Sequence, residues 1–167
     1  KIDCAIVGEP TSLNMAVAEK GLLVLDCIAN GKAGHAARNE GVNALYIAMK
    51  DINWLSTYKF PKVSSLLGPV HIAVTSVNTE NKTHNVVPSE CNFLVDIRVN
   101  ELYSFEEVID ALKKNIVSEI HPRSIRLKPS FIEENHPLVK AGRKMGIESY
   151  VSSTSSDMAL MDFLSLK

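Results

Sequence analysis

A glycine-rich turn that presents a histidine is the part of the sequence best suited to chemistry. The turn, residues 31–38 (Gly-Lys-Ala-Gly-His-Ala-Ala-Arg), lies between an apolar run over 22–29 and an amphipathic run over 42–54. Glycine lets the backbone take positive φ or approach another group closely, and histidine titrates near neutral pH. His35 is therefore a candidate for acid–base work or hydrogen-bond donation. The alternative is a simple glycine turn with an exposed surface histidine.

A carboxylate follows the first apolar run. Residues 4–7 (Cys-Ala-Ile-Val) have the pattern of a strand buried on both faces, and Gly8 ends it. Glu9 would then lie at the carboxyl end of the strand, where open α/β sheets place ligand groups, and Pro10 favours an extended conformation there. Because carboxylate oxygens are hard donors, Glu9 is a candidate metal ligand. The alternative is a solvated loop glutamate.

Arg98 and a serine-rich segment are further candidates for substrate contact. Residues 91–98 alternate between apolar and polar side chains, which predicts a strand with Arg98 on the polar face, opposite the core. Residues 152–157 (Ser-Ser-Thr-Ser-Ser-Asp) form a hydroxyl-rich loop. This loop either caps a helix predicted over 158–163 or holds a substrate through its hydroxyl groups.

The composition is that of an ordinary globular chain and excludes several classes of function. The chain has 167 residues, of which 46% are hydrophobic and 22% charged, and a formal net charge of −1. No basic stripe is present, so we expect no nucleic-acid partner, and the apolar runs are too short to cross a membrane. The three cysteines have apolar, strand-like neighbours, which predicts buried reduced thiols in a cytoplasmic protein. Because the chain lacks an initiator methionine, we expect it to be a piece of a longer protein.

The elements that position these residues follow an ordered pattern. Strands are predicted over 22–29, 70–77, 91–97 and 124–128, and amphipathic helices over 42–55 and 104–118. Ser104 is suited to cap the second helix. The order strand, helix, strand, strand, helix, strand predicts a ferredoxin-like βαββαβ fold of the α+β class. Beyond residue 129 we expect a short helix starting at Pro137 and a strand over 149–151.

Four short motifs together resemble the M20 metallopeptidase family. They are residues 7–11 (Val-Gly-Glu-Pro-Thr), 31–35 (Gly-Lys-Ala-Gly-His), 85–88 (Asn-Val-Val-Pro) and 96–98 (Asp-Ile-Arg). Within the family the chain is most similar to the acetylornithine deacetylase and succinyl-diaminopimelate desuccinylase type. The resemblance implies a cytoplasmic homodimeric amidohydrolase with a pair of zinc or cobalt ions in each subunit. Such an enzyme would remove an acetyl or succinyl group from a small N-acylated amino acid such as acetylornithine.

The resemblance also implies a division of the chain. Residues 1–12 and 131–167 would be pieces of an α/β zinc-peptidase catalytic domain, and residues 13–130 would be an inserted dimerisation, or lid, domain. Glu133 and Glu134 fall on the wrong side of the insert for the paired glutamates of the family, so we interpret them as a solvated turn. Because most metal ligands would lie outside this chain, we expect the chain alone to be inactive and to bind no zinc.

Roles for individual residues follow from the same resemblance. Glu9 matches a terminal metal ligand, and His35 matches a histidine that enters the active site of the partner subunit and stabilises the oxyanion. Asn85 matches an asparagine that contacts substrate across the dimer, and Arg98 matches an arginine that holds the substrate carboxylate. Ser155 lies in a segment that matches a substrate-contacting loop, where the chain departs from the Gly-Thr pair frequent in the family.

Two other functions stay open at this point. An M20 di- or tripeptidase or carboxypeptidase would share every motif above. A ferredoxin-like dimerisation or regulatory module without catalysis would share the fold. Such a module would need neither His35 nor Arg98, because packing alone requires no residue of these types at these positions.

Overall fold

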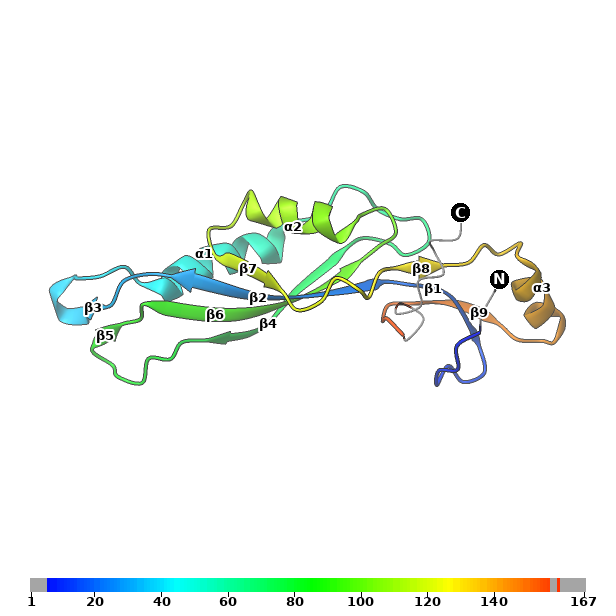
Figure 1. Ribbon diagram of the computed structural model, residues 1–167, viewed down its shortest axis with the longest axis horizontal. Helices are drawn as coiled ribbons and strands as arrows, with labels where there is room; N and C mark the ends of the chain where they lie inside the picture. The colour runs from blue at the N-terminus through cyan, green and yellow to red at the C-terminus, as the bar shows by residue number, and fades with distance from the viewer. Residues whose placement is uncertain (1–5, 157–158, 160–167) are drawn as a thin grey trace.

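The chain forms two main sheets that follow one another along an elongated molecule (Figure 1). The computed structural model describes residues 6–156 and residue 159. The larger sheet has four strands and carries two helices, and the smaller sheet has three strands and one helix. A two-stranded ribbon extends the larger sheet at the end opposite the smaller one (Figure 1).

The four-stranded sheet has the predicted ferredoxin-like fold. Its strands are β2 (Gly21–Asn30), β4 (His71–Asn78), β6 (Glu90–Val99) and β7 (Glu119–Pro122). They lie in the order β4-β6-β2-β7, and every neighbouring pair is antiparallel. Two helices, α1 (Ala44–Thr57) and α2 (Phe105–Lys113), lie on the same side of this sheet (Figure 1). The connection order and strand order together confirm the βαββαβ prediction.

Strict alternation along β2 and β6 produces the core. Every second residue of each central strand faces the helices and is buried; these residues are Leu23, Leu25, Cys27 and Ala29 on β2, and Cys91, Phe93, Val95, Ile97 and Val99 on β6. The intervening residues are mostly half-buried and lie on the face without helices. Because the side-chain period of a strand is two, the same pattern places Asp96 and Arg98 together on that open face.

Capping residues set the start of both helices. The Asn43 side chain accepts a hydrogen bond from Leu45 N at 2.9 Å and caps α1, which starts two residues later than the pattern alone indicates. Ser104 and Glu107 form a reciprocal capping box at the start of α2, as expected for Ser104. The predicted end of α2 near residue 118 is wrong. The helix ends at Lys113, and Ile116 still reaches the core from the tightened turn that follows.

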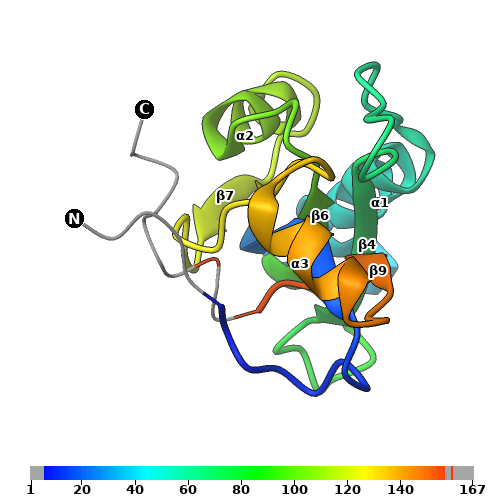
Figure 2. The ribbon, with the colours of Figure 1, turned by 90° about the vertical axis from the view of Figure 1, so that its right-hand side faces the viewer.

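The smaller sheet contains strands from both ends of the described chain. Its order is β8 (Ser130–Phe131), β1 (Met15–Glu19), β9 (Ser149–Ser152), with β1 and β9 parallel. Helix α3 (Pro137–Lys144) lies at its outer end (Figure 2). Thus β1 pairs within the smaller sheet, although the predicted 13–130 division groups it with the ferredoxin-like segment. The chain passes between the sheets at Lys20 and again at residues 123–129.

Two local predictions, the strands over 124–128 and over 4–7, need correction. No strand covers 124–128; the fourth strand is β7, which ends at Pro122 and pairs only with β2 among the described residues, so the missing N–H of the proline faces a free edge. Ile6 and Val7 lie outside any strand, and Ile6 is 84% exposed. Helix α3 ends at Lys144 and includes Gly142, which packs against the Met15 side chain. The helix predicted over 158–163 falls almost entirely outside the described residues.

Two of the cysteines are buried thiols, as predicted. Cys27 and Cys91 are unpaired and buried in the core, whereas Cys4 lies outside the described residues. Burial raises the pKa of Cys27 to about 12, and the nearby carboxylates of Asp26 and Asp51 add to this effect. Within the described part of the chain, no helix is both long and apolar enough to span a membrane.

Candidate functional site

The glycine turn folds back tightly on the start of α1. Lys32 and Val42 exchange two backbone hydrogen bonds of 2.8 Å. A Cβ atom at Gly31 would overlap the carbonyl oxygen of Val42, and one at Gly34 would overlap that of Glu40. Both glycines are therefore required by close backbone approach, which is one of the two reasons the sequence suggested.

The turn holds His35 in a defined tautomer. His35 caps the short 3-10 helix Ala36–Arg38, and its Nδ1 accepts a hydrogen bond from Ala37 N at 3.2 Å. In a neutral imidazole only one ring nitrogen carries a proton, so acceptance at Nδ1 leaves the proton on Nε2. The half-buried His35 side chain thus offers Nε2–H as a hydrogen-bond donor.

A two-stranded ribbon places Asn85 next to this histidine. Strand β3 (Gly34–His35) pairs with β5 (Val86–Val87), and Ala36 N donates to the Asn85 carbonyl at 3.0 Å. Asn85 has an exposed side chain and immediately precedes Val86, the residue that pairs with His35. Asn81 fastens the preceding loop, because its Nδ2 donates to the Val86 carbonyl at 2.5 Å. His35 and Asn85, which are 50 residues apart in sequence, are brought together at this tip.

Arg98 lies on the open face of β6 and is paired with a carboxylate. Its Nε and Nη2 donate to the two carboxylate oxygens of Asp96 at 2.7 and 3.0 Å. Both side chains are about one-quarter exposed. This bidentate ion pair neutralises the guanidinium charge and fixes the plane of the group. Nη1 takes part in neither of the two hydrogen bonds. The sequence predicted the face of Arg98 correctly but not its pairing with Asp96.

Ser155 and Ser156 form hydrogen bonds with Lys20 and Glu19, where the chain passes from β1 to β2. The Ser155 hydroxyl donates to the Lys20 carbonyl at 2.6 Å. The backbone N–H and hydroxyl of Ser156 both donate to the Glu19 carboxylate, at 3.0 and 2.7 Å. The hydroxyl-rich loop is therefore held to the passage between the sheets, and the Ser155 hydroxyl proton is already used there.

Glu9 alone cannot form a metal site. It is exposed in the segment before β1, and its backbone carbonyl accepts a hydrogen bond from Thr11 N at 2.8 Å. The described residues contain no group of three or more His, Cys, Asp or Glu side chains that could hold a metal ion. A zinc site needs at least three protein ligands, so the described residues do not make a complete zinc site by themselves.

The candidate residues form two groups at opposite ends of the ferredoxin-like sheet. Arg98 pairs in register with Leu22, near the start of β2, whereas His35 lies beyond Asn30, where β2 ends. Eight residue steps separate Leu22 from Asn30, which corresponds to about 26 Å of extended strand. Ser155 lies with Arg98 at the end of the sheet nearest the smaller sheet, and Asn85 lies with His35 at the far tip (Figure 1). A compound the size of an acylated amino acid is too short to contact His35 and Arg98 of one chain at the same time.

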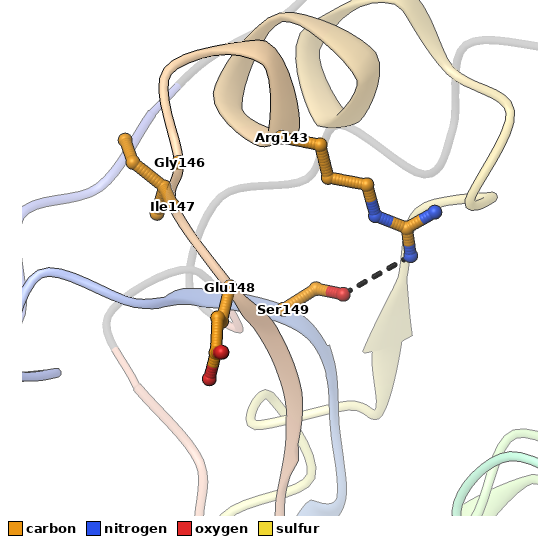
Figure 3. A pocket seen from close by; sticks show the side chains of 5 residues that line it. All are labelled: Arg143, Gly146, Ile147, Glu148 and Ser149. Atoms are coloured by element: carbon orange, nitrogen blue, oxygen red, sulfur yellow. Dashed lines mark hydrogen bonds between the residues drawn. The ribbon is translucent and has the colours of Figure 1, made fainter.

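A shallow hollow near α3 contains none of these residues. It has a volume of about 430 Å³ and is lined by Arg143, Gly146, Ile147, Glu148 and Ser149. Arg143 extends from the end of α3 toward β9 and donates to the Ser149 hydroxyl at 3.1 Å (Figure 3). It also pairs with Glu134 at 3.4 Å, so the predicted solvated turn at Glu134 carries a surface ion pair.

Residues 17–123 match a sequence family described as the peptidase dimerisation domain of M20 proteins. The chain belongs to the M20 peptidase dimerisation-domain family. This match covers the whole four-stranded sheet, both of its helices and the ribbon that carries His35. The family assignment therefore rests on the part of the chain that forms the ferredoxin-like fold.

Two curated relatives of this M20 chain have the same name. It is 28% identical over 122 residues to the succinyl-diaminopimelate desuccinylase of Orientia tsutsugamushi (strain Boryong), covering 70% of this chain and 31% of that protein. It is also 28% identical over 182 aligned positions to the enzyme of the same name from Ehrlichia ruminantium (strain Gardel), covering 98% of this chain and 46% of that protein. The chain thus spans less than half the length of either relative.

Two solved peptidase structures share the fold. A tripeptidase from Staphylococcus aureus superposes with a TM-score of 0.68 at 18% identity, covering 91% of this chain and 43% of that one. An M20 family metallo-carboxypeptidase from Sulfolobus solfataricus superposes with a TM-score of 0.67 at 17% identity, covering 94% and 58%. Because these superpositions extend over nearly the whole chain, both sheets are part of the shared fold.

Proposed function

We propose that the full-length protein containing this chain is a homodimeric amidohydrolase that removes an acetyl or succinyl group from a small N-acylated amino acid. The observation that carries the proposal is the separation of His35 and Asn85 from Arg98 along the sheet. A site that needs all three side chains must draw them from two subunits. Membership of a dimerisation-domain family supports that arrangement.

In this proposal His35 stabilises the oxyanion in the site of the partner subunit. Its Nε2–H faces away from the bond that Nδ1 makes with Ala37, so it is the ring atom available to a substrate. The exposed Asn85 amide lies on the adjacent strand segment and can contact the same substrate. A preorganised donor of this kind lowers the barrier because it favours the negative charge that develops on the carbonyl oxygen in the transition state.

In this proposal Arg98 binds the substrate carboxylate, and it belongs to the subunit whose site receives His35 from the partner. Asp96 fixes the guanidinium plane and uses Nε and Nη2, so Nη1 is the edge open to a second carboxylate. Ser155 belongs to this end of the molecule and contributes through the loop that it anchors to Lys20. Arginine suits this role because its planar fork matches carboxylate geometry.

The family resemblance implies a pair of zinc or cobalt ions that would supply an activated water. The described residues do not make such a site, and Glu9 is the one ligand that the resemblance assigns to this chain. Residues 1–12 and 131–167 would belong to the catalytic domain that holds the ions, and residues 13–130 to the lid. We propose a cytoplasmic location on the same grounds.

The homodimer forms through the ferredoxin-like segment in this proposal. Strand β4 is an edge strand, with β6 its only partner among the described residues, so its outer edge is open to pairing with a second copy. Helix α1, which packs against β4, exposes Tyr46 and Met49, which are 63% and 55% exposed. An apolar helix face beside a free strand edge is a suitable surface for a symmetric dimer.

The name of the two relatives described above favours succinyl over acetyl as the group removed. A second candidate is peptide hydrolysis, because two structural neighbours are described as a tripeptidase and a metallo-carboxypeptidase. The two candidates differ in the amide that is cleaved: the one joining an acyl group to a single amino acid, or the one joining two residues of a peptide.

The test is an assay of the full-length protein, supplied with zinc or cobalt, against succinyl-diaminopimelate, acetylornithine and a simple tripeptide. We expect kcat/KM for one of the acylated amino acids to exceed that for the tripeptide by at least about tenfold. Preferential hydrolysis of the tripeptide would favour the second candidate. No hydrolysis of any of the three would support a dimerisation module without catalysis.

A further inference from the structure

Where the chain passes from β1 to β2, two adjacent side chains bind loops on opposite sides of the crossing. Glu19 ends β1 and is only 8% exposed, and its carboxylate accepts both hydrogen bonds from Ser156. Lys20 follows at once, and its Nζ donates to the Pro69 carbonyl at 2.6 Å. Glu19 thus holds a loop next to the smaller sheet, and Lys20 holds a loop of the ferredoxin-like fold.

The loop after β9 is bonded to this passage at several points. Lys20 N donates to the Ser152 carbonyl at 3.3 Å, and the Ser155 hydroxyl donates to the Lys20 carbonyl. Together with the bonds from Ser156 to Glu19, these contacts attach the loop to both residues at the passage. Any rotation of the chain at Lys20 must therefore move this loop or break these bonds.

A second crossing of the chain restricts the same passage. Gly21 lies against Pro129, where a Cβ atom would overlap the proline ring, and Leu22 N donates to the Leu127 carbonyl at 2.8 Å. The two crossings are thus in direct contact.

The buried carboxylate is the strongest of these attachments. Hydrogen bonds to an ionised carboxylate are roughly twice as strong as those between neutral groups, and a nearly buried carboxylate is costly without such donors. The Ser156 N–H and hydroxyl supply two of them. Loss of the carboxylate would remove the acceptor that the Ser156 backbone amide and hydroxyl share.

We propose that Glu19 is a positioning residue that sets the conformation of the Ser155–Ser156 loop and links it to the passage between the sheets. This inference rests on the proposed function, in which that loop contacts the substrate. Because Glu19 acts through Ser156 and does not touch the reacting atoms, its loss affects substrate binding more than the chemical step.

The experiment compares E19A, E19Q and the matched control E133Q in the full-length protein. Glu133 is an exposed carboxylate in the turn before α3. We expect E19A to raise KM for the acylated amino acid by about tenfold or more, with kcat changed less than about threefold. Amide hydrogen exchange at Ser156 should speed up by at least about tenfold in the same variant. E19Q keeps one carbonyl acceptor and should fall between E19A and wild type, whereas E133Q should match wild type.

The exchange measurement needs no substrate, so it separates this inference from the proposed function. If the wild-type protein hydrolyses none of the tested amides, the proposed function fails, and Ser156 exchange alone decides whether Glu19 holds the loop. Wild-type KM together with wild-type exchange at Ser156 in E19Q and E19A would overturn the inference. A lower melting temperature without a change in either quantity would also overturn it, because it would indicate a purely structural role. If E19A does not fold, E19Q carries the comparison.

Discussion

His35 and Arg98 lie toward opposite ends of the antiparallel pair β2–β6: His35 ends β3, beyond the end of β2, and Arg98 lies on β6 opposite the start of β2. About 26 Å of strand separates the register position of Arg98 from the end of β2. A substrate the size of an acylated amino acid cannot bridge that distance. If both residues serve one active site, each site of a dimer is built from two chains.

The first prediction concerns the histidine. Substituting His35 by alanine in the full-length protein removes the Nε2–H donor, so we expect kcat to fall by about a hundredfold to a thousandfold. His121→Ala is a matched control, since His121 is an exposed histidine on β7 paired with Glu119. Steady-state kinetics on both variants give the comparison. Equal turnover in the two variants would show that His35 takes no part in the reaction.

A second prediction concerns a buried carboxylate that joins α1 to the segment just before β7. Asp51 is 5% exposed and accepts hydrogen bonds from Ser118 N, at 2.9 Å, and from the Ser118 hydroxyl, at 2.6 Å. Asp51→Ala leaves these donors unsatisfied, so we expect a loss of about 1–3 kcal/mol in the free energy of unfolding. Asp110→Ala, on the exposed side of α2, should change it by less than about 0.5 kcal/mol. Denaturant titration of the two variants measures the difference, and equal midpoints would contradict the assignment.

The third prediction concerns the centre of the core. Leu25 is fully buried between the sheet and the helices, so Leu25→Ala should cost about 2–5 kcal/mol through lost burial and the cavity left behind. Val117→Ala serves as the control, because Val117 is 79% exposed. Thermal unfolding followed by circular dichroism would report the two effects. A destabilisation by the Val117 variant as large as that by the Leu25 variant would mean that the core is placed wrongly.

The fourth prediction concerns thiol chemistry and pH. Because the pKa of Cys27 is raised to about 12, its thiolate is a minor species at pH 8 and should not react with a disulfide reagent in the folded protein. An unfolded chain has an ordinary thiol pKa near 9, so the stabilisation from keeping Cys27 neutral is full below pH 9 and is lost as the pH rises from 9 to 12. Mass spectrometry of labelled peptides identifies which cysteine reacts. Rapid labelling of Cys27 at pH 8 in native protein would be inconsistent with its burial.

The strongest sequence patterns predicted the structure well. The alternation over residues 91–98 gave both the strand and the face of Arg98, and the apolar spacing after residue 42 gave α1. Short elements were missed: β7 has a single isoleucine among its four residues, and β3 and β5 have two residues each, too few to show a period. Their pairing, which sets His35 beside Asn85, depends on contacts far apart in sequence.

The site was predicted as a set of residues but not as an arrangement. Motifs named His35, Asn85 and Arg98, yet no local pattern indicates that Asp96 occupies the Arg98 fork or that Ser155 bonds to Lys20. These contacts join elements whose relative placement comes from the fold. Whether the named residues act as the family resemblance implies stays a prediction.

Complementation between two inactive variants tests the two-chain site most directly. His35→Ala and Arg98→Ala would be prepared separately as full-length proteins, mixed, and allowed to exchange subunits. Each mixed dimer then contains one site with both side chains intact and one site with neither. We predict that activity recovers to about one quarter of wild type, because half of the dimers are mixed and each carries one working site of two. No recovery, with mixed dimers demonstrated by native mass spectrometry, would contradict the account.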